Sequence, residues 1–417
     1  MPIPPNPPLP PRIERLARLA GLAERRVLGL MSGTSLDGLD LALCTIGGQS
    51  PGTIGGQGPD TAWRLERFHT LPYSAEQRER LLAVVSQPRA GLRELAVLNA
   101  WLAGLHAAMV RDSLAAWDVD PASVHLLASH GVTVYHAPGA WEEQGTPRHA
   151  TLQLGDGDQL AVATGLLTVS DFRQKEIALG GEGAPLAPYG DALLFTADAP
   201  RVLLNLGGIA NFTRLASKSD PASPLSGDTG PANGLIDRAV RRLLPGHSHP
   251  YDHDGLLAAQ GKVSAPLLES LLEHPYYARP FPKSTGAETF GDACLEDLLN
   301  RPEAKGLAPH HLIATLTRLT VRTVAEAMRR ECGNLAGTEI AVSGGGRRNP
   351  VMMEGLRTEM PEASWIEMES LGLPPDAKEA VLFAVLAHES LFGEGFPQPG
   401  EGPEGRRFGF GKLSWPN

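Results

Sequence analysis

The sequence has few cysteines. Cys44, Cys294 and Cys332 are the three among 417 residues, and no two of them have C-x-x-C spacing. Scattered single thiols are typical of a reducing compartment and argue against a structural zinc site. No apolar run approaches the roughly 20 residues that a membrane-spanning helix needs. The first residues are prolines rather than a basic segment followed by an apolar one, which argues against a signal peptide. These absences predict a cytoplasmic protein.

An excess of positive charge is also absent. Lys and Arg number 37 against 47 Asp and Glu, which gives a formal net charge of −10. This balance argues against nucleic acid or an acidic membrane surface as a partner, although a local basic site can still hold an anion. Hydrophobic residues make up 42% and charged residues 20%, as in ordinary soluble globular proteins. The length suffices for two domains, each with its own core.

A glycine-rich turn separates two apolar runs near the start of the chain. Leu28–Met31 is apolar, and Leu39–Leu43 is apolar apart from Asp40, a pattern that predicts a β-hairpin. Glycines let the backbone approach a ligand closely, hydroxyls and free amides can cradle phosphate, and carboxylates can hold Mg²⁺. The candidate cofactor-binding residues of this tip are Gly33, Thr34, Ser35, Leu36, Asp37, Gly38, Leu39 and Asp40, with Asp37 and Asp40 as candidate metal ligands. The alternative is an ordinary glycine-rich hairpin.

The pattern recurs in the second half of the chain. Arg201–Leu206 and Ile209–Leu215 are strand candidates on either side of a Gly-Gly tip. Two such hairpins suggest two like-folded domains that close over one nucleotide. The candidates for cofactor binding here are Asn205, Gly207, Gly208 and Asn211.

A third glycine cluster follows the predicted strand Glu339–Val342. Without side chains, its backbone would let a flat base or a ribose lie against it. The candidate residues are Gly344, Gly345, Gly346 and Asn349.

Two polar residues follow predicted strands, where ligands gather in open α/β sheets. His130 comes after Val124–Ser129, as a substrate contact or as a structural histidine. Asp171 comes after Leu166–Ser170 and is followed by Arg173 and Lys175. Nearby cations keep an aspartate ionised and able to accept a proton, so Asp171 is either a general base or a salt-bridged loop residue.

Three further groups of polar residues have local explanations. Asp228 and Thr229 precede a predicted helix. They either cap this helix or help its N-terminus to bind an anion. Asp376 and Glu379 have capping-box spacing at the start of a long predicted helix. The histidines at 247, 249 and 253 match no zinc signature, and a solvated loop is the favoured interpretation.

The motif series resembles the sugar kinase, heat-shock chaperone and actin superfamily, and most closely the 1,6-anhydro-N-acetylmuramic acid kinase family. The similarity runs from about Arg26 to about Phe392. Its motifs are Met31–Gly38, Ser129–Gly131, Thr151–Gln153, Asp171–Arg173, Gly180–Leu186, Asp228–Pro231 and Pro282–Gly286. An ordered series of this kind is far more specific than one glycine motif.

The resemblance implies an α/β protein of two duplicated RNase H-like (actin-like ATPase) domains, with ATP and Mg²⁺ in an interdomain nucleotide cleft. The expected organisation is a Pro-rich tail and short helix over 1–25, domain I over 26–137 plus 380–417, and domain II over 138–379. The resemblance also implies a homodimer that works on a small amino sugar.

The reaction implied is hydrolytic opening of 1,6-anhydro-N-acetylmuramic acid and phosphorylation of O6, which gives N-acetylmuramic acid 6-phosphate in cell-wall recycling. Asp171 would be the catalytic base. Substrate contacts would come from His130, Arg173, Thr229 and Glu379. The alternatives are a kinase of another amino sugar and a nucleotide-gated binding protein of the actin or chaperone kind.

Several residues depart from the family pattern. The family usually has glutamine at Glu182, phenylalanine at Gly190 and histidine at Asp191. It usually has phenylalanine at Gly227, glycine at Ala232 and arginine at Ala287. Glu182, Asp191 and the missing arginine make this part of the chain more acidic. If they face the pocket, they would alter recognition of the carboxylate of the sugar.

Overall fold

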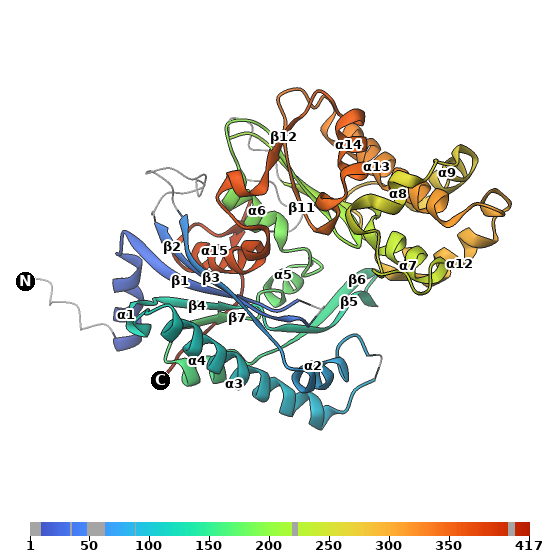
Figure 1. Ribbon diagram of the computed structural model, residues 1–417. Coiled ribbons are helices and arrows are strands. Elements are labelled where there is room, and N and C mark those ends of the chain that lie inside the picture. Colours follow the sequence, from blue (N-terminus) through green and yellow to red (C-terminus); the bar gives the residue numbers. More distant parts are fainter. Residues whose placement is uncertain (1–9, 34–35, 48–62, 88, 219–223, 399–404) are drawn as a thin grey trace, which may run out of the picture. The chain divides into compact units, whose positions relative to one another are not determined.

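The computed structural model describes residues 10–33, 36–47, 63–87, 89–218, 224–398 and 405–417 (Figure 1). The chain divides into two compact units. Unit 1 is Met1–Leu194 together with Asp376–Asn417, and unit 2 is Phe195–Pro375. Each unit has its own sheet and its own buried core, so each is described by itself.

Unit 1 is built on a six-stranded sheet in the order β15-β7-β4-β1-β2-β3. The pairs β1/β2 and β2/β3 are antiparallel, β1/β4 and β4/β7 are parallel, and β15 runs antiparallel to β7. The strands are β1 (Glu24–Met31), β2 (Gly38–Gly47), β3 (Trp63–Pro72), β4 (Leu126–Ser129), β7 (Thr168–Ser170) and β15 (Lys412–Ser414). The first predicted hairpin, β1–β2, is confirmed, with Met31 opposite Asp40.

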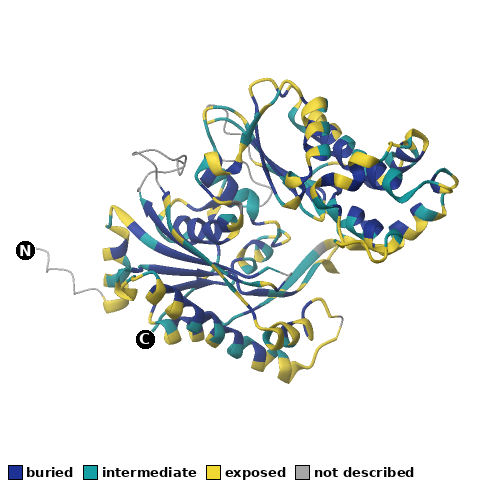
Figure 2. Ribbon diagram, in the orientation of Figure 1, coloured by how far each residue is buried: buried dark blue, intermediate teal, exposed yellow. Residues whose placement is uncertain are grey.

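Helices cover both faces of this sheet. Helix α15 (Lys378–Phe392) packs so closely on β1 that a Cβ at Gly29 would lie 1.9 Å from the carbonyl oxygen of Ala380. Leu28 and Leu30 share a buried cluster with Leu98 and Leu102 of α3 (Leu92–Ala116). Figure 2 shows this as dark-blue, buried residues along the strands and α15. The other helices are α1 (Pro11–Ala20), α2 (Ala75–Leu82), α4 (Gly157–Thr164), α5 (Gln174–Ala178) and α6 (Ala187–Phe195).

Unit 2 repeats the topology of unit 1. Its five strands lie in the order β10-β9-β8-β11-β12, with β8/β9 and β9/β10 antiparallel and β8/β11 and β11/β12 parallel. The strands are β8 (Arg201–Leu206), β9 (Ile209–Leu215), β10 (Leu225–Pro231), β11 (Glu339–Ser343) and β12 (Ser364–Glu367). The second predicted hairpin is therefore also confirmed, and the shared strand order and directions confirm a duplicated α/β fold of the RNase H-like type.

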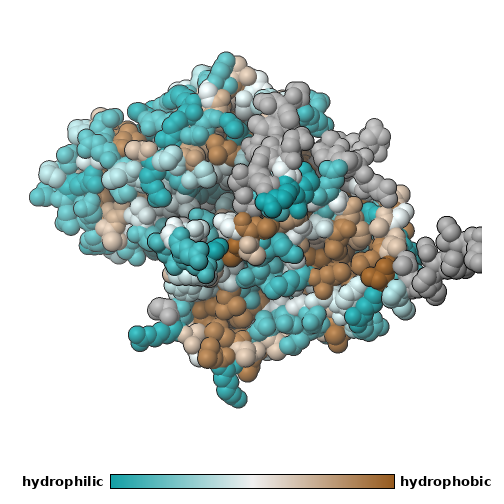
Figure 3. Space-filling model, turned by 180° about the vertical axis from the view of Figure 1, so that it is seen from behind, coloured by the Kyte–Doolittle hydropathy of each residue, from teal (hydrophilic) through white to brown (hydrophobic). Residues whose placement is uncertain are grey.

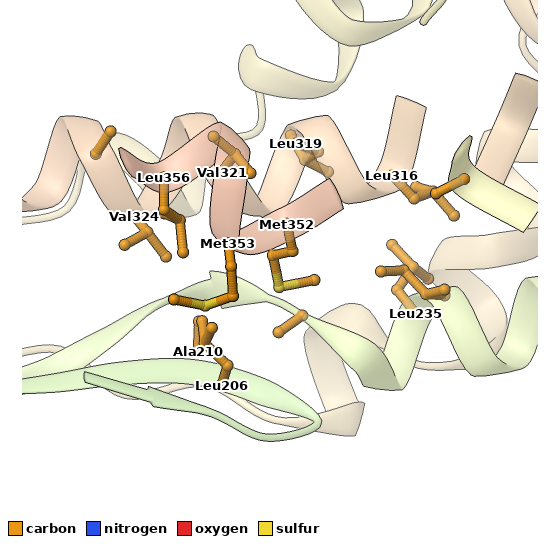
Figure 4. Packing of buried hydrophobic residues seen from close by; sticks show 14 of the residues in the cluster. Leu206, Ala210, Leu235, Leu316, Leu319, Val321, Val324, Met352, Met353 and Leu356 are labelled. Atoms are coloured by element: carbon orange, nitrogen blue, oxygen red, sulfur yellow. The ribbon is translucent and has the colours of Figure 1, made fainter. Parts of the chain in front are cut away.

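The core of unit 2 lies between its sheet and two long helices. Met353 and Leu356 of α14 (Pro350–Glu359) pack with Val321 and Val324 of α13 (Pro309–Cys332), and the cluster extends to Leu206 (Figure 4). The remaining helices are α7 (Asn233–Leu243), α8 (Leu256–Gln260), α9 (Ala265–Leu272), α10 (Pro275–Ala278), α11 (Ala287–Phe290) and α12 (Asp292–Asn300). Short 3₁₀ turns are η1 (Pro121–Ser123), η2 (His253–Gly255), η3 (Pro302–Ala304), η4 (Gly345–Arg348), η5 (Met368–Leu371) and η6 (Pro375–Ala377).

Several segments differ from what their local sequence suggests. Residues 137–147, which contain glycines and prolines, are part of a long hairpin, β5 (Val132–Glu143) with β6 (Thr146–Leu154). The end of the chain contains β13 (Phe396–Pro397), β14 (Arg407–Phe408) and β15, which joins the main sheet. Neither Asp376 nor Asp228 caps a helix, because α15 begins after Ala377 and α7 after Ala232, without side-chain caps.

The boundaries of the compact units, at 194/195 and 375/376, differ from the expected domain limits at 137/138 and 379/380. Residues 138–194 belong to unit 1, because β7 pairs with β4 in its sheet. The interdomain nucleotide cleft stays a prediction. Within the described ranges, every helix is too short or too polar to cross a membrane. Figure 3 shows hydrophilic residues with apolar patches between them on one face.

Candidate active site

The tip of the first hairpin combines buried apolar residues with two carboxylates. Leu36 and Leu39 are fully buried, so they could contribute only backbone groups to a ligand. Gly38 lies so close to β3 that a Cβ would come within 2.3 Å of the carbonyl oxygen of Leu71. The amide of Leu36 donates to the carbonyl of Gly33 at 3.1 Å, which closes the turn. Thr34 and Ser35 lie outside the described residues.

The two carboxylates of this tip differ in their surroundings. Asp37 keeps 76% of its side chain exposed and has Arg78 at 4.0 Å. Asp40 accepts a hydrogen bond from Oγ1 of Thr70 at 2.6 Å, and burial raises the pKa of its carboxyl group. Oxygen donors of this kind fit Mg²⁺, which keeps several waters of its own. In the part of the chain that the structure describes, no set of three His, Cys, Asp or Glu side chains is arranged to hold a metal.

The second hairpin is anchored by its own carbonyl groups. The carbonyl of Gly208 accepts from the amides of Ala232 and Gly234, and that of Gly207 from the amide of Asn233, each at 3.0 Å. These bonds tie the tip to the start of α7. What the tip can offer a phosphate is therefore its N–H groups.

The structure brings the third glycine cluster onto the second hairpin. Gly344 has a φ of 82°, and a Cβ there would lie 2.6 Å from Oδ1 of Asn205, which stands opposite Asn211 in the ladder. A Cβ at Gly346 would lie 2.7 Å from Cβ of Leu206. Asn349 is buried and caps α14, because its Oδ1 accepts from the amide of Met352 at 3.1 Å. Gly345 lies beside these residues in η4.

His130 and Arg173 form the centre of a polar cluster in unit 1. Nε of Arg173 donates to Nε2 of His130 at 2.9 Å, and its Nη1 donates to the carbonyl of Gly183 at 2.9 Å. Burial and the neighbouring Arg173 lower the pKa of His130 to about 3, so the ring is neutral. Two predicted substrate residues thus meet, and they hold the glycine-rich turn at 180–186.

Glu176 joins this cluster, although the sequence analysis missed it. It is buried, accepts from the hydroxyl of Tyr189 at 3.1 Å and from the amide of Gly183, and burial raises the pKa of its carboxyl group. Its other oxygen, Oε2, is buried and has no partner among the described residues. The sequence could have indicated Glu176, because it lies three residues after Arg173 and therefore on the same helical turn.

Glu379 lies at the start of α15, beside a buried ion pair. Lys378 reaches the carboxylate of Asp191 at 3.0 Å, where Asp191 has 1% and Lys378 has 16% of its side chain exposed. Part of Glu379 is exposed, but desolvation by the surrounding protein raises the pKa of its carboxyl group, and the negative charges of Asp40 and Asp191 act in the same direction.

Asp171 is held by a cation from the far end of the chain. Lys412 on β15 forms an ion pair with its carboxylate, because Lys412 is the register partner of Ser170 on β7. Asp171 itself adopts a φ of 58°. The sequence predicted Arg173 and Lys175 as the cations near Asp171, but its ion-pair partner in the structure is Lys412.

In unit 2, Asp228 has the electrostatics of a proton acceptor. Its Oδ2 accepts from the amide of Thr285 at 2.8 Å, and burial is the main cause that raises its pKa to about 6. Its neighbour Thr229 is buried on β10 and donates to the carbonyl of Ala210 at 3.2 Å. The signal for Asp228 was an aspartate within the Asp-Thr-Gly-Pro motif.

The departures from the family pattern are accommodated by packing. A Cβ at Gly227 would lie 2.5 Å from Phe281, and one at Gly190 would lie 2.5 Å from Leu382, so the smaller residues leave room for these side chains. Asp191 is paired with Lys378, so its charge is compensated. Glu182 is exposed, and Ala287 opens α11.

Comparisons with known proteins agree over most of the chain. A family model described as "Anhydro-N-acetylmuramic acid kinase" matches residues 25–402. The curated anhydro-N-acetylmuramic acid kinase of Pseudoalteromonas atlantica is 42% identical over 402 residues, covering 94% of this chain and 96% of the relative. That of Salinibacter ruber is 39% identical, covering 94% and 97%. Among solved structures, a glucokinase of Streptomyces griseus is 11% identical with a TM-score of 0.35, covering 87% and 99%, a likeness too low to carry an argument.

Proposed function

The chain belongs to the anhydro-N-acetylmuramic acid kinase family, and we propose that it converts 1,6-anhydro-N-acetylmuramic acid and ATP to N-acetylmuramic acid 6-phosphate and ADP. The observation that carries the proposal is the duplicated topology with a glycine hairpin between the first two strands of each sheet. Glycine hairpins at equivalent positions suit a nucleoside triphosphate, and family membership indicates which sugar is the substrate.

The proposed reaction joins two events on one sugar. Water adds to C1, the C1–O6 bond of the anhydro bridge breaks, and the released O6 takes the γ-phosphoryl group of ATP. The proton that the water loses passes to a protein carboxylate and then to solvent. Phosphoryl transfer depends mostly on positioning and on neutralising charge, so amide groups of the hairpin tips suit this half of the reaction.

We assign the nucleotide to the glycine segments. The tip over 33–40, the tip at Gly207 and Gly208, and the cluster Gly344–Gly346 would contact it through backbone N–H groups. Asp37 and Asp40 would hold Mg²⁺, which supplies charge neutralisation for the phosphates. Asn205, packed on Gly344, would fix the shape of this site, and Asn349 would act through its cap of α14.

Arg173, His130 and Glu379 are proposed to contact the sugar. The Arg173–His130–Gly183 hydrogen bonds support this role, because they fix a cation at the turn over 180–186. Cations of this kind suit the lactyl carboxylate of the substrate. Thr229 is the corresponding candidate in unit 2. The homodimer and a cytoplasmic location remain further parts of the proposal, and the net charge of −10 favours neither nucleic acid nor membranes as partners.

Asp171 is the first candidate for the base that takes the proton from water. It follows a strand of the parallel part of the sheet, and Lys412 forms an ion pair with its carboxylate. Asp228 is a second candidate, which one observation favours: burial raises its pKa to about 6, close to the value that suits a general base at neutral pH.

The test is ADP release with Mg-ATP, with and without 1,6-anhydro-N-acetylmuramic acid, followed by mass analysis of the sugar. We expect a product heavier by one phosphate and one water. Turnover only with an unbridged amino sugar would replace the proposed substrate.

The two carboxylates are then compared as Asp171→Asn and Asp228→Asn. The variant that lacks the base should lose sugar-dependent turnover by more than 100-fold and still bind ATP. If Asp228 is the base, kcat/KM of the unchanged protein should rise with pH through about 6. Full turnover in one variant excludes that residue as the base.

A further inference from the structure

Unit 2 contains a basic pocket that the proposed reaction does not use. The pocket has a volume of about 220 Å³ and lies between the start of α14 and the edge strand β12. Its walls include Arg347, Arg348 and Arg357, together with Trp365 and Glu367. A local excess of positive charge is unusual in a chain whose net charge is −10.

Two of the arginines have no ion-pair partner. Arg347 lies 3.6 Å from the carboxylate of Glu369, which partly balances its charge. Arg348 and Arg357 form no ion pair with any described residue, and both are exposed at the mouth of the pocket. Guanidinium groups gathered around a hollow favour carboxylate or phosphate ligands, because they present planar pairs of donors.

Trp365 of β12 forms part of the pocket wall. The indole nitrogen Nε1 of Trp365 is buried, and within the described ranges nothing accepts its hydrogen bond. An indole nitrogen is a donor only, and a buried donor without an acceptor carries a free-energy cost. Pro350, the first residue of α14, also lines the pocket, so the positive end of that helix faces the same region.

The pocket is separate from the glycine cluster assigned to the nucleotide. Side chains added at Gly344 and Gly346 would run into Asn205 and Leu206, so the contact face of the cluster points toward the β8–β9 hairpin. The pocket, in contrast, is lined by Trp365 and Glu367 of β12, on the other side of β11.

We propose that this pocket binds a small phosphate monoester other than the nucleotide, with the arginines on the phosphate and the Trp365 ring as part of the wall. Its volume is below the roughly 300 Å³ of drug-sized sites, so the ligand is small. A phosphate monoester carries up to two negative charges at pH 7 and three acceptor oxygens, which matches a set of donors. Glu367 also lines the pocket, and its carboxylate could accept a hydrogen bond from a hydroxyl or amino group of the ester.

The experiment uses the full chain saturated with Mg-ADP, so that the nucleotide's phosphate positions are filled. Inorganic phosphate and glucosamine 6-phosphate are titrated, and binding is followed by calorimetry and by tryptophan fluorescence. We expect saturable binding of glucosamine 6-phosphate, at least tenfold weaker in Arg357→Gln, and a fluorescence change that Trp365→Phe removes. Arg322→Gln is the matched control, because Arg322 pairs with Glu326 on α13, away from the pocket, and should bind as the unchanged protein does.

Three outcomes would overturn the proposal. They are no binding at saturating ADP, equal affinity in Arg357→Gln, and release of the ester by ADP, which would assign the pocket to the nucleotide. Binding is measured without the sugar substrate, so these outcomes are independent of whether 1,6-anhydro-N-acetylmuramic acid is turned over. If Trp365→Phe fails to fold, the comparison of Arg357→Gln with Arg322→Gln still decides the question.

Discussion

Arg173 donates from Nε to Nε2 of His130 over 2.9 Å, which makes that nitrogen an acceptor. The proton of the neutral ring therefore sits on Nδ1, which donates to the carbonyl of Gly131 at 3.0 Å. With its pKa lowered to about 3, His130 does not gain charge near neutral pH. We infer that His130 positions Arg173 rather than carrying protons itself.

Arg173→Lys should damage sugar binding and spare ATP binding. An ammonium cannot reproduce the fork that reaches both His130 and the carbonyl of Gly183. We expect the KM for the anhydro sugar to rise about tenfold, which corresponds to about 1.4 kcal/mol, with the KM for ATP unchanged, in steady-state kinetics. Arg148→Lys, in an exposed pair with Glu143, serves as the control. Equal effects on both KM values would contradict the assignment.

Buried neutral histidines should make the protein sensitive to acid. Burial lowers the pKa of His106 to about 3, well below the 6.5 of an unfolded histidine, so the unfolded chain binds more protons between these values. Stability is therefore complete above pH 6.5 and falls as the pH drops below it, by about 2 kcal/mol for this one residue at about pH 5.

This prediction is checked by urea unfolding at pH 7 and pH 5. His106→Gln should remove about that much of the pH dependence, because glutamine does not bind a proton in this pH range. Glutamine can still donate a hydrogen bond to the hydroxyl of Tyr73, which should preserve the local structure. His310→Gln, at a partly exposed histidine whose ring lies against that of His311, is the matched control for the loss of one histidine. An unchanged dependence in His106→Gln would show that other groups cause it.

Asp191→Asn should be strongly destabilising. The substitution would remove the carboxylate that lies 3.0 Å from Nζ of Lys378, at a site where the side chain of Asp191 is only 1% exposed. The ammonium group would then lack its counter-charge. Breaking a buried pair from one side typically costs about 3–5 kcal/mol, whereas replacing both partners by apolar residues costs much less. Urea unfolding should thus show that Asp191→Leu with Lys378→Met recovers most of the loss. Asp198→Asn, in an exposed pair with Lys218, should change stability by less than about 0.5 kcal/mol.

Gly344→Ala should separate crowding from backbone strain. Both Gly344 and Gly337 have positive φ, at 82° and 77°, but a Cβ at Gly337 meets nothing within 4 Å. Gly337→Ala should therefore cost only about 1–2 kcal/mol of stability, with unchanged kinetics. Gly344→Ala should cost more and raise the KM for ATP at least tenfold, because the Cβ would displace Asn205. Similar kinetics in the two variants would remove Gly344 from the nucleotide site.

Local patterns predicted the elements that depend on local chemistry. Ser74 and Gln77 form a capping box at the start of α2, and the buried Leu98 and Leu102 of α3 have helical spacing. The same holds for the two hairpins, whose glycine tips interrupt apolar runs. In each case the interacting residues are neighbours in sequence, so the pattern contains the interaction.

Contacts between distant segments could not be predicted in this way. Lys412 is the ion-pair partner of Asp171 because a three-residue strand joins the sheet edge, and three residues are too few for a periodic signal. Asp228 was interpreted either as a cap or as a residue that helps to bind an anion, because it precedes a helix. Its raised pKa depends on burial within the fold, and its hydrogen-bond donor Thr285 lies far along the chain. The partners of these two carboxylates therefore depend on the fold and not on neighbouring residues in the sequence.

Unit 1 has a consequence for synthesis on the ribosome. Its sheet is flanked by α15 and extended by β15, and both follow unit 2 in the chain. Helix α15 fills the face of the sheet at Gly29, so a nascent chain that ends before residue 376 leaves that face uncovered. Unit 2 is continuous and can fold as soon as it emerges, whereas the unit that begins first must be completed last. Chaperones that shield apolar sheet surface would act on this waiting intermediate.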